Sequence, residues 1–192
     1  MTVHPSVERA ALGELPSWTE ADQDRRGHMA RVAALVDAWG VALGLSEEER
    51  VRWAAVAWLH DALRSADPEA LRARVPAAMS ALPGLLLHGP AAAERLRGDG
   101  VRDGDLLRAI AYHTLGHARL GALGRALYAA DFLEPGRDLL NEWRSALRER
   151  MPGALTDVVR EVLGARIAHL VGRGSTLRPE TVEFWNSLAE AE

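Results

Sequence analysis

An adjacent histidine and aspartate, His60 and Asp61, follow a short apolar run of helical character that begins at Val56. An imidazole nitrogen and a carboxylate oxygen are ligands that divalent transition ions prefer, and adjacency lets one segment provide both. The dipeptide alone is a weak signal, because a solvent-facing pair at a helix end has the same sequence. Further candidate ligands occur in comparable settings, namely His28, His88, His113 and Asp131.

The helices that would carry these side chains can be placed from hydrophobic periodicity and capping residues. Ser17 or Thr19 can cap a helix that runs to about residue 43, and His28 falls on its apolar stripe. A lone histidine on such a stripe is more often a core residue than a ligand. Ser46 and Glu49 form a capping-box pattern for the next helix, which carries the His60-Asp61 pair near its end.

The downstream candidates are predicted at further helix ends. A triple leucine brings His88 to a turn, and Pro90 opens the helix that follows. A helix capped by Asp103 or Asp105 ends near His113.

Asp131 belongs to a predicted helix over residues 121–133, beside an apolar stripe. A carboxylate in that position is costly unless hydrogen bonds, water or a cation neutralise it. Inward-facing ligands on several helices are a known way to hold one or two metals in a bundle, so we expect a metal centre if these helices converge.

The rest of the chain is predicted to be scaffold. Residues 1–18 are expected to form an irregular N-terminal extension, and residues 138–192 to form further helices. We find no repeat or linker that divides the chain, so residues 1–192 are predicted to form a single all-α domain.

Composition narrows the function. The chain has 192 residues, a net charge of −4 and no cysteine, so a metal must be held by nitrogen and oxygen ligands. The charge gives no reason to expect binding to nucleic acid or to an anionic membrane. No signal segment and no apolar run of about 18 residues is visible, so a cytoplasmic location is expected.

The order of the candidate ligands resembles that of the HD-domain metal-dependent phosphohydrolases. The strings around them narrow the resemblance to the YqeK-type family, which contains bacterial symmetrical diadenosine tetraphosphate hydrolases. These strings are Leu86-Leu87-His88-Gly89-Pro90, Ala109-Ile110-Ala111-Tyr112-His113-Thr114-Leu115-Gly116, the stretch from Leu127 to Arg137, and that from Pro179 to Asn186. The likeness extends from about residue 25 to residue 188.

The resemblance implies an HD-domain helical bundle with two buried divalent transition-metal ions, iron being the usual ion and manganese or zinc the alternatives. One ion would be held by His28, His60, Asp61 and Asp131. The second would be held by His88 and His113, with Asp61 bridging the two ions. Known members cleave diadenosine tetraphosphate in the middle of its phosphate chain and release two ADP molecules.

Such a site permits phosphoryl chemistry on general grounds. Paired cations acidify a water molecule and clamp phosphoryl oxygens, and Asp61 or Asp131 could orient or deprotonate that water. Arg64 and Arg137 are candidate phosphate ligands, because a guanidinium binds phosphate through paired hydrogen bonds. Thr114 could donate its hydroxyl to a phosphate oxygen. For Arg64, Arg137 and Thr114 the alternative is a surface ion pair or a helix cap.

Two positions depart from the family pattern. Arg64 stands where the family usually has lysine three residues after the His-Asp pair, so a compact ammonium donor is replaced by a planar guanidinium. His117 stands where the family more often has arginine. His117 could cost a phosphate contact, or it could add a ligand or a proton donor.

Three hypotheses follow. The first is a metal-dependent hydrolase of diadenosine tetraphosphate or a related dinucleoside polyphosphate. The second keeps the metal site but takes another phosphoester, as in a nucleotidase or a cyclic-nucleotide phosphodiesterase. The third is a non-catalytic module that binds a nucleotide or a metal. A dinucleoside polyphosphate or nucleotide is the expected ligand, and a homodimer is left open.

Overall fold

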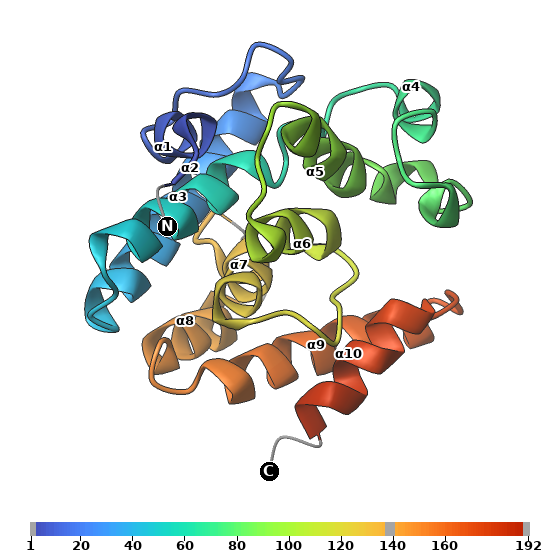
Figure 1. Cartoon of the computed structure of the whole chain (residues 1–192). Coiled ribbons are helices and arrows are strands. Elements are labelled where there is room, and N and C mark those ends of the chain that lie inside the picture. Colours follow the sequence, from blue (N-terminus) through green and yellow to red (C-terminus); the bar gives the residue numbers. More distant parts are fainter. Residues whose placement is uncertain (1–2, 137–140, 190–192) are drawn as a thin grey trace.

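The computed structural model describes residues 3–136 and 141–189. Within these residues the chain forms ten α-helices and two short 3-10 helices, with no β-strand (Figure 1). In chain order they are α1 (Pro5–Ala11), α2 (Gln23–Ala42), α3 (Glu47–Leu59), α4 (Pro68–Arg72), η1 (Ala77–Met79), η2 (Gly84–Leu86), α5 (His88–Gly98), α6 (Gly104–Tyr112), α7 (Ala122–Leu133), α8 (Asn141–Arg150), α9 (Leu155–Gly172) and α10 (Pro179–Ala189). The prediction of an all-α fold is confirmed.

Side-chain caps fix where the ligand-bearing helices begin. Ser46 and Glu49 form the predicted capping box at the start of α3, and Asp103 caps α6. The predicted cap of α2 at Ser17 or Thr19 is wrong, because Asp22 accepts the first-turn N–H of Arg25 at 2.8 Å. The preceding residues cannot be helical, since the backbone of Glu20 is bonded to Ala62 and Ser65.

The prediction of an irregular segment over residues 1–18 is wrong for residues 5–11, which form α1. Pro5 occupies the first turn, where a missing N–H costs nothing, and the His4 ring accepts the N–H of Ser6. Val7 and Ala10 are buried, and the helix packs against α3. A short amphipathic helix is stable at this place because tertiary burial supports it.

The start of α5 also differs from the prediction. We expect His88 in a turn and Pro90 as the opening residue, but His88 is already the first residue of the helix. Pro90 fits the first turn, where an N–H has no partner within the helix. His88 is thereby held at a helix end, where its ring can reach back to the preceding turn.

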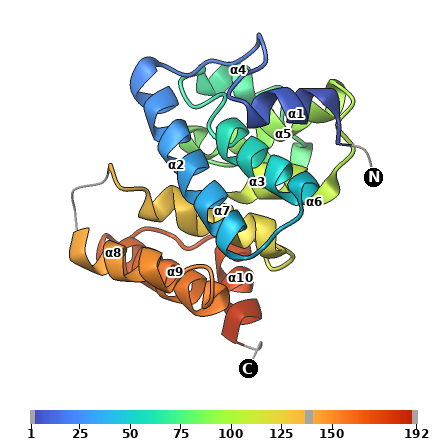
Figure 2. The same ribbon diagram turned by 90° about the vertical axis from the view of Figure 1, so that its left-hand side faces the viewer.

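Helix α7 lies at the centre of the fold. It packs against α2, α3, α6, α8 and α9, and the first two views show it between the N-terminal helices and the layer that contains α8, α9 and α10 (Figures 1 and 2). Its buried face includes Ala126, Ala129 and Ala130, whose small side chains let neighbouring helices approach closely. A side chain of α7 beside this alanine face therefore lies close to several of the helices that pack against α7.

The C-terminal helices hold the turn that follows α6. Thr181 of α10 donates a hydrogen bond of 2.8 Å to the carbonyl of Leu115, and Arg166 of α9 donates one of 2.8 Å to the carbonyl of Thr114. Phe184, which is fully buried, packs against Gly116, whose φ of +77° suits glycine. These contacts explain how helices far along the chain stabilise the residues next to His113.

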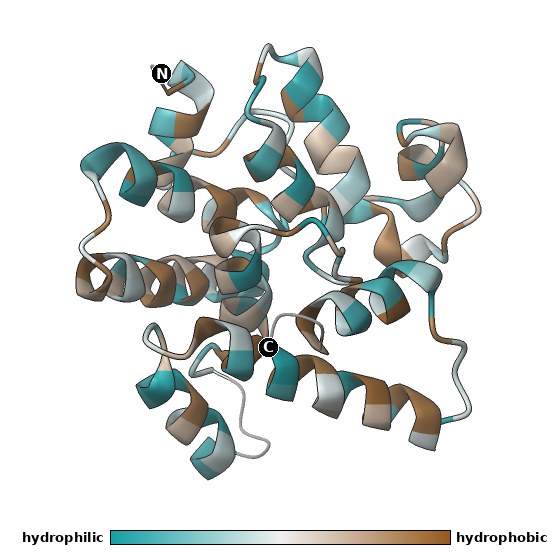
Figure 3. Ribbon diagram, turned by 60° about the horizontal axis from the view of Figure 1, so that its bottom comes forward, coloured by the Kyte–Doolittle hydropathy of each residue, from teal (hydrophilic) through white to brown (hydrophobic). Residues whose placement is uncertain are grey.

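Hydrophobic and hydrophilic residues alternate along the helices, as expected for amphipathic helices around a common core (Figure 3). Of the helices in residues 3–136 and 141–189, none combines the length and the apolar character that crossing a membrane requires.

Candidate metal centre

His60 and Asp61 lie where α3 ends. The N–H of His60 still bonds to the carbonyl of Val56, so His60 is the C-cap of the helix and Asp61 is the first residue of the following turn. The exposed fraction is 0% for His60 and 3% for Asp61. A buried carboxylate requires compensating charge or hydrogen bonds, so the surroundings of this pair are decisive.

The structure brings the other candidate ligands to the same place from four separate elements. His28 comes from α2, His88 from the first residue of α5, His113 from the C-cap of α6, and Asp131 from the last turns of α7. The three histidines are buried, and 14% of the Asp131 side chain is exposed. We refer to these six residues, including His60 and Asp61, as the His/Asp cluster.

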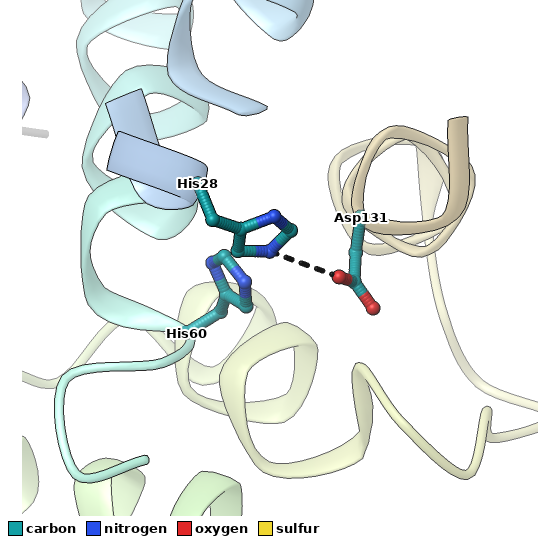
Figure 4. Close-up of side chains that lie close together, drawn as sticks. All are labelled: His28, His60 and Asp131. Carbon is teal, nitrogen blue, oxygen red and sulfur yellow. Dashed lines mark ion pairs between the residues drawn. The ribbon is translucent and has the colours of Figure 1, made fainter. Parts of the chain in front are cut away.

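Two overlapping groups within the cluster have the spacing of metal ligands. Donor atoms of His28, His60 and Asp131 all lie within 4.8 Å of one another, and so do those of His60, Asp61 and His113. Figure 4 shows the rings of His28 and His60 close together, with the carboxylate of Asp131 facing them from α7. His88 adjoins the second group, since its Nε2 lies 3.1 Å from Oδ1 of Asp61.

Backbone hydrogen bonds determine which nitrogen of three histidines faces the cluster. The Nδ1 atoms of His60, His88 and His113 lie 2.7, 3.0 and 2.8 Å from the carbonyl oxygens of Ala57, Leu85 and Ile110. A carbonyl oxygen only accepts, so Nδ1 must carry the proton. In the neutral ring Nε2 is then a bare acceptor directed at the cluster, which is the state a metal ligand requires.

These bare nitrogens are poorly satisfied by protein atoms alone. The Nε2 atoms of His88 and His113 lie 3.1 Å apart, so two lone pairs face each other if both rings are neutral. The Nε2 atoms of His28 and His60 are buried and make no hydrogen bond of good geometry among the described residues, although Oδ1 of Asp131 lies 3.2 Å from Nε2 of His28 (Figure 4). Nitrogen and oxygen donors without sulfur suit iron, manganese or zinc, so the residues fit the metal centre that the sequence predicts.

Asp61 lies between the two groups of histidines. Its Oδ1 is 3.1 Å from Nε2 of His88 and 3.5 Å from that of His113, whereas Oδ2 is 3.5 Å from Nε2 of His60. Burial raises the pKa of the carboxyl, but charge on His60 and the hydrogen bonds that the three rings donate when Nε2 is also protonated outweigh burial and hold the pKa well below its usual range. An ionised carboxylate with one oxygen toward each group is suited to bridging two cations.

The electrostatics at His60 also favour positive charge. Burial opposes charge on the ring, yet the carboxylate of Asp61 outweighs burial and raises the pKa of His60.

Asp131 is likewise ionised. Burial is again the largest opposing effect, and His28 together with the charges of the other rings lowers the pKa of Asp131. Two buried carboxylates among bare imidazole nitrogens thus form a cation site.

Sequence reasoning missed two residues that contact the cluster, Arg25 and Glu134, and a third, Arg31, that contacts Glu134. Arg25 donates a hydrogen bond of 2.8 Å from Nη1 to Oδ2 of Asp61. Glu134 lies with Oε1 3.3 Å from Nδ1 of His28, and Arg31 donates from Nε to Oε2 of Glu134 at 2.6 Å. Arg25, His28 and Arg31 are spaced by three residues and share one face of α2, which is the signal that could have revealed both arginines.

The predicted substrate contacts have different surroundings. Thr114 lies with Oγ1 3.0 Å from Nε2 of His113, so it is part of the cluster's edge. Arg64 is half-buried and near His88, where its charge, after the larger effects of burial and His113, contributes to lowering the pKa of His88. No carboxylate among the described residues pairs with the Arg64 guanidinium.

His117 and Arg137 are not brought to the cluster by any described contact. The His117 ring packs on Tyr112 with centroids 4.5 Å apart, its Nδ1 accepts the N–H of Arg119, and it lines a cavity of about 280 Å³. Burial and the charges of Arg119 and Arg108 lower the pKa of His117. Arg137 lies outside the described residues.

The sequence and the fold of this chain are similar to those of proteins that contain an HD domain. A model of the HD domain matches residues 25–150, a span that begins at Arg25 and contains all six residues of the cluster. A solved structure described as a predicted HD superfamily hydrolase involved in NAD metabolism, from Clostridium acetobutylicum, covers 100% of both chains with a TM-score of 0.78. The sequence identity is 21%, so this likeness shows the fold alone.

Curated relatives share part of the sequence. Symmetrical bis(5'-nucleosyl)-tetraphosphatases from Halalkalibacterium halodurans and Staphylococcus aureus are 28% identical over 106 residues and 27% identical over 104 residues. These alignments cover 54% and 53% of this chain, and the same shares of the relatives. A third, from Bacillus subtilis, is 29% identical over 106 residues, which are 54% of this chain and 55% of that protein. The chain thus spans about half the length of the curated relatives it matches.

Proposed function

The chain belongs to the HD domain family, and we propose that it hydrolyses diadenosine tetraphosphate symmetrically to two ADP molecules. Activity as a metal-dependent phosphohydrolase agrees with membership of the HD domain family and with the buried His/Asp cluster. The narrower substrate is supported by the three curated relatives, each named as a symmetrical bis(5'-nucleosyl)-tetraphosphatase.

The observation that carries the metal-dependent part is the arrangement around Asp61. Its two carboxylate oxygens face different histidines, and the Nε2 atoms of these rings have no proton to donate if the rings are neutral. Two divalent ions in such a place would acidify a water molecule and neutralise the phosphate oxygens. We propose that His28, His60, Asp61 and Asp131 hold one ion, and that His88, His113 and Asp61 hold the other.

The protein's own groups have defined tasks in the reaction. Asp131 is ionised and partly exposed, so it can accept a hydrogen bond from the attacking water and orient the water oxygen toward phosphorus, while the proton of the water passes to solvent. Attack on one of the two central phosphorus atoms forms a new P–O bond and breaks the bond to the central bridging oxygen. That oxygen leaves with the second ADP and takes up a proton.

Guanidinium groups would hold the polyphosphate. Arg64 is half-buried, follows Asp61 by three residues and has no carboxylate partner among the described residues, so its donors are free for phosphate oxygens. Arg25 is part of the same surroundings, with 30% of its side chain exposed and one donor on Asp61. Arg137 and the Thr114 hydroxyl remain proposed contacts, as does His117.

The test is a product analysis. Protein loaded with iron(II) or manganese(II) is incubated with diadenosine tetraphosphate, and nucleotides are separated by anion-exchange chromatography. We expect ADP as the sole product. Formation of AMP with ATP would contradict symmetric cleavage, and absence of turnover would reject this substrate.

A second candidate keeps the site and changes the ester. His117 packs on Tyr112 and no described contact joins it to the cluster, so a phosphate contact expected at this position in the family is in doubt. A nucleotidase or cyclic-nucleotide phosphodiesterase would tolerate that loss more readily, because its substrate has a shorter phosphate chain. Nucleoside monophosphates and cyclic nucleotides, assayed beside the dinucleotide at equal metal loading, decide between the two.

A further inference from the structure

We propose that Glu134 is the positioning residue of His28: its carboxylate accepts the Nδ1–H proton, orients Nε2 toward the cluster and strengthens that nitrogen as a ligand. The inference rests on the metal-binding part of the proposed function. It concerns a residue outside the predicted ligand set, at a distance of 3.3 Å between Oε1 of Glu134 and Nδ1 of His28.

His28 needs such a partner because of its position in the chain. The other three histidines of the cluster lie at helix ends, and each directs Nδ1 at the carbonyl oxygen three residues earlier. His28 lies inside α2, where the carbonyls one turn earlier already accept helical N–H groups. Its Nδ1 must therefore find an acceptor on another element, and Glu134, directly after α7, is that acceptor.

Glu134 is held firmly in this role. It is 2% exposed, and its second oxygen, Oε2, accepts hydrogen bonds from Nε of Arg31 at 2.6 Å and from the N–H of Gly136 at 2.8 Å. The guanidinium of Arg31 therefore supplies positive charge directly to this buried carboxylate. The acceptor of the His28 Nδ1–H hydrogen bond is thus a carboxylate paired with arginine rather than a neutral carbonyl.

Gly136 makes room for this arrangement. A β-carbon at that position would lie 2.5 Å from Nε of Arg31 and 2.7 Å from its Cζ, so any other residue would require the guanidinium to move from its present place. Arg31 is thereby directed at Oε2, and Oε1 is left for His28. The segment Glu134-Pro135-Gly136 and Arg31 together orient the imidazole ring of His28.

An anionic acceptor on Nδ1 changes what Nε2 can do. A carboxylate behind a metal-binding histidine fixes its tautomer and raises its basicity, and loss of such a partner typically weakens metal binding about 10–100-fold. Of the four histidines in the cluster, His28 is the one whose Nδ1 lies next to a carboxylate among the described residues. Glu134 therefore acts on the group formed by His28, His60 and Asp131.

The first experiment determines the tautomer of the His28 ring. Nitrogen chemical shifts of the His28 ring, measured by NMR in chelator-treated protein, report which nitrogen carries the proton. We expect the Nδ1–H tautomer in the wild type and in Glu134→Gln, whose amide oxygen still accepts. Glu134→Ala should give a mixture of tautomers. An unchanged Nδ1–H tautomer in Glu134→Ala would overturn the proposal.

The second experiment measures binding of manganese(II) or zinc(II) to the same variants by competition with a chromophoric chelator. Glu134→Ala should weaken the tightest binding step about 10–100-fold, and Glu134→Gln should restore part of it. Glu161→Gln is the matched control, because Glu161 forms a surface ion pair with Arg150. Equal affinities in wild type and Glu134→Ala would reduce Glu134 to a structural role and reject the inference.

The two experiments separate this inference from the proposed function. Metal affinity and tautomer are measured without substrate, so a protein that binds metal through a positioned His28 but cleaves no dinucleotide would retain the inference and lose the proposed activity. If Glu134→Ala instead cleaves the dinucleotide fully and its His28 ring keeps the wild-type tautomer, the proposed activity is retained and the inference about Glu134 is rejected.

Discussion

The guanidinium of Arg25 donates a hydrogen bond of 2.8 Å to Oδ2 of Asp61, which links the first turn of α2 to the turn after α3. The carboxylate is almost fully buried, whereas 30% of the Arg25 side chain is exposed. Arg25 therefore supplies positive charge to Asp61 from the outer side of the cluster, and the bond joins two elements that both provide candidate ligands.

We expect Arg25→Ala to destabilise chelator-treated protein by about 1.5–3 kcal/mol, the contribution typical of a hydrogen bond to a charged group. Protein saturated with manganese(II) should lose less stability, because a bound cation compensates Asp61 and stabilises the folded state by mass action. Thermal melts of both forms measure the difference. Arg26→Ala is the control, since the Arg26 guanidinium bonds to the backbone carbonyl of Ala21. An equal loss in both forms would contradict the role given to Arg25.

Asp61→Ala is expected to remove metal binding and hydrolysis together. The variant loses the carboxylate whose two oxygens face both groups of histidines, so metal affinity should fall by more than the roughly 100-fold that loss of a hydrogen-bond partner behind a metal ligand can cause. Metal content after dialysis and turnover of the dinucleotide are the two measurements. Asp37→Ala, which breaks a surface ion pair with Arg50, should change neither. Full turnover by Asp61→Ala would be incompatible with the proposed centre.

Periodicity and capping residues place each candidate ligand on a helix face or at a helix end, but their convergence is expected only from the resemblance to the HD-domain family, because it depends on how the helices pack. The contacts of Arg25 and Arg31 could not be derived in this way. Their partners are 36 and 103 residues away in the chain, so the pairing depends on how α2 packs against α3 and α7. In the sequence Glu134 stands out only as part of the stretch from Leu127 to Arg137 that carries the family resemblance.

The pH dependence of stability should show the ion pair between Asp103 and Arg52. Burial raises the pKa of Asp103, but Arg52 outweighs burial and lowers it below the ordinary value of 3.8. A lowered carboxyl pKa stabilises the fold above the unfolded-state value, and this stabilisation is lost as the pH falls through the folded-state value. The loss therefore begins near pH 4 and continues below it.

Asp103→Asn isolates this effect, because asparagine can still cap α6. At pH 7 the wild type should be more stable than the variant by about 1 kcal/mol, and the difference should vanish near pH 2. Urea unfolding at a series of pH values measures it. A difference that stays constant from pH 7 to pH 2 would show that the charge of Asp103 does not contribute.

Helix α10 supports the turn after α6, and a substitution at Gly116 tests this support. Its φ of +77° is unfavourable for other residues, and a β-carbon there would overlap the ring of Phe184. Gly116→Ala should therefore lower stability by about 2–4 kcal/mol, from backbone strain and overpacking together. Metal affinity should fall as well, because the same turn carries His113 and Thr114.

Combining Gly116→Ala with Phe184→Ala separates the two causes. The smaller side chain removes the overlap but not the strained φ, so the double variant should recover about 1–3 kcal/mol relative to the sum of the single changes. Chemical unfolding gives the coupling energy, and the chelator competition assay shows whether metal affinity recovers with it. Strict additivity of the two substitutions would mean that Phe184 does not press on this turn, and that α10 supports His113 through the hydrogen bond from Thr181 to Leu115 alone.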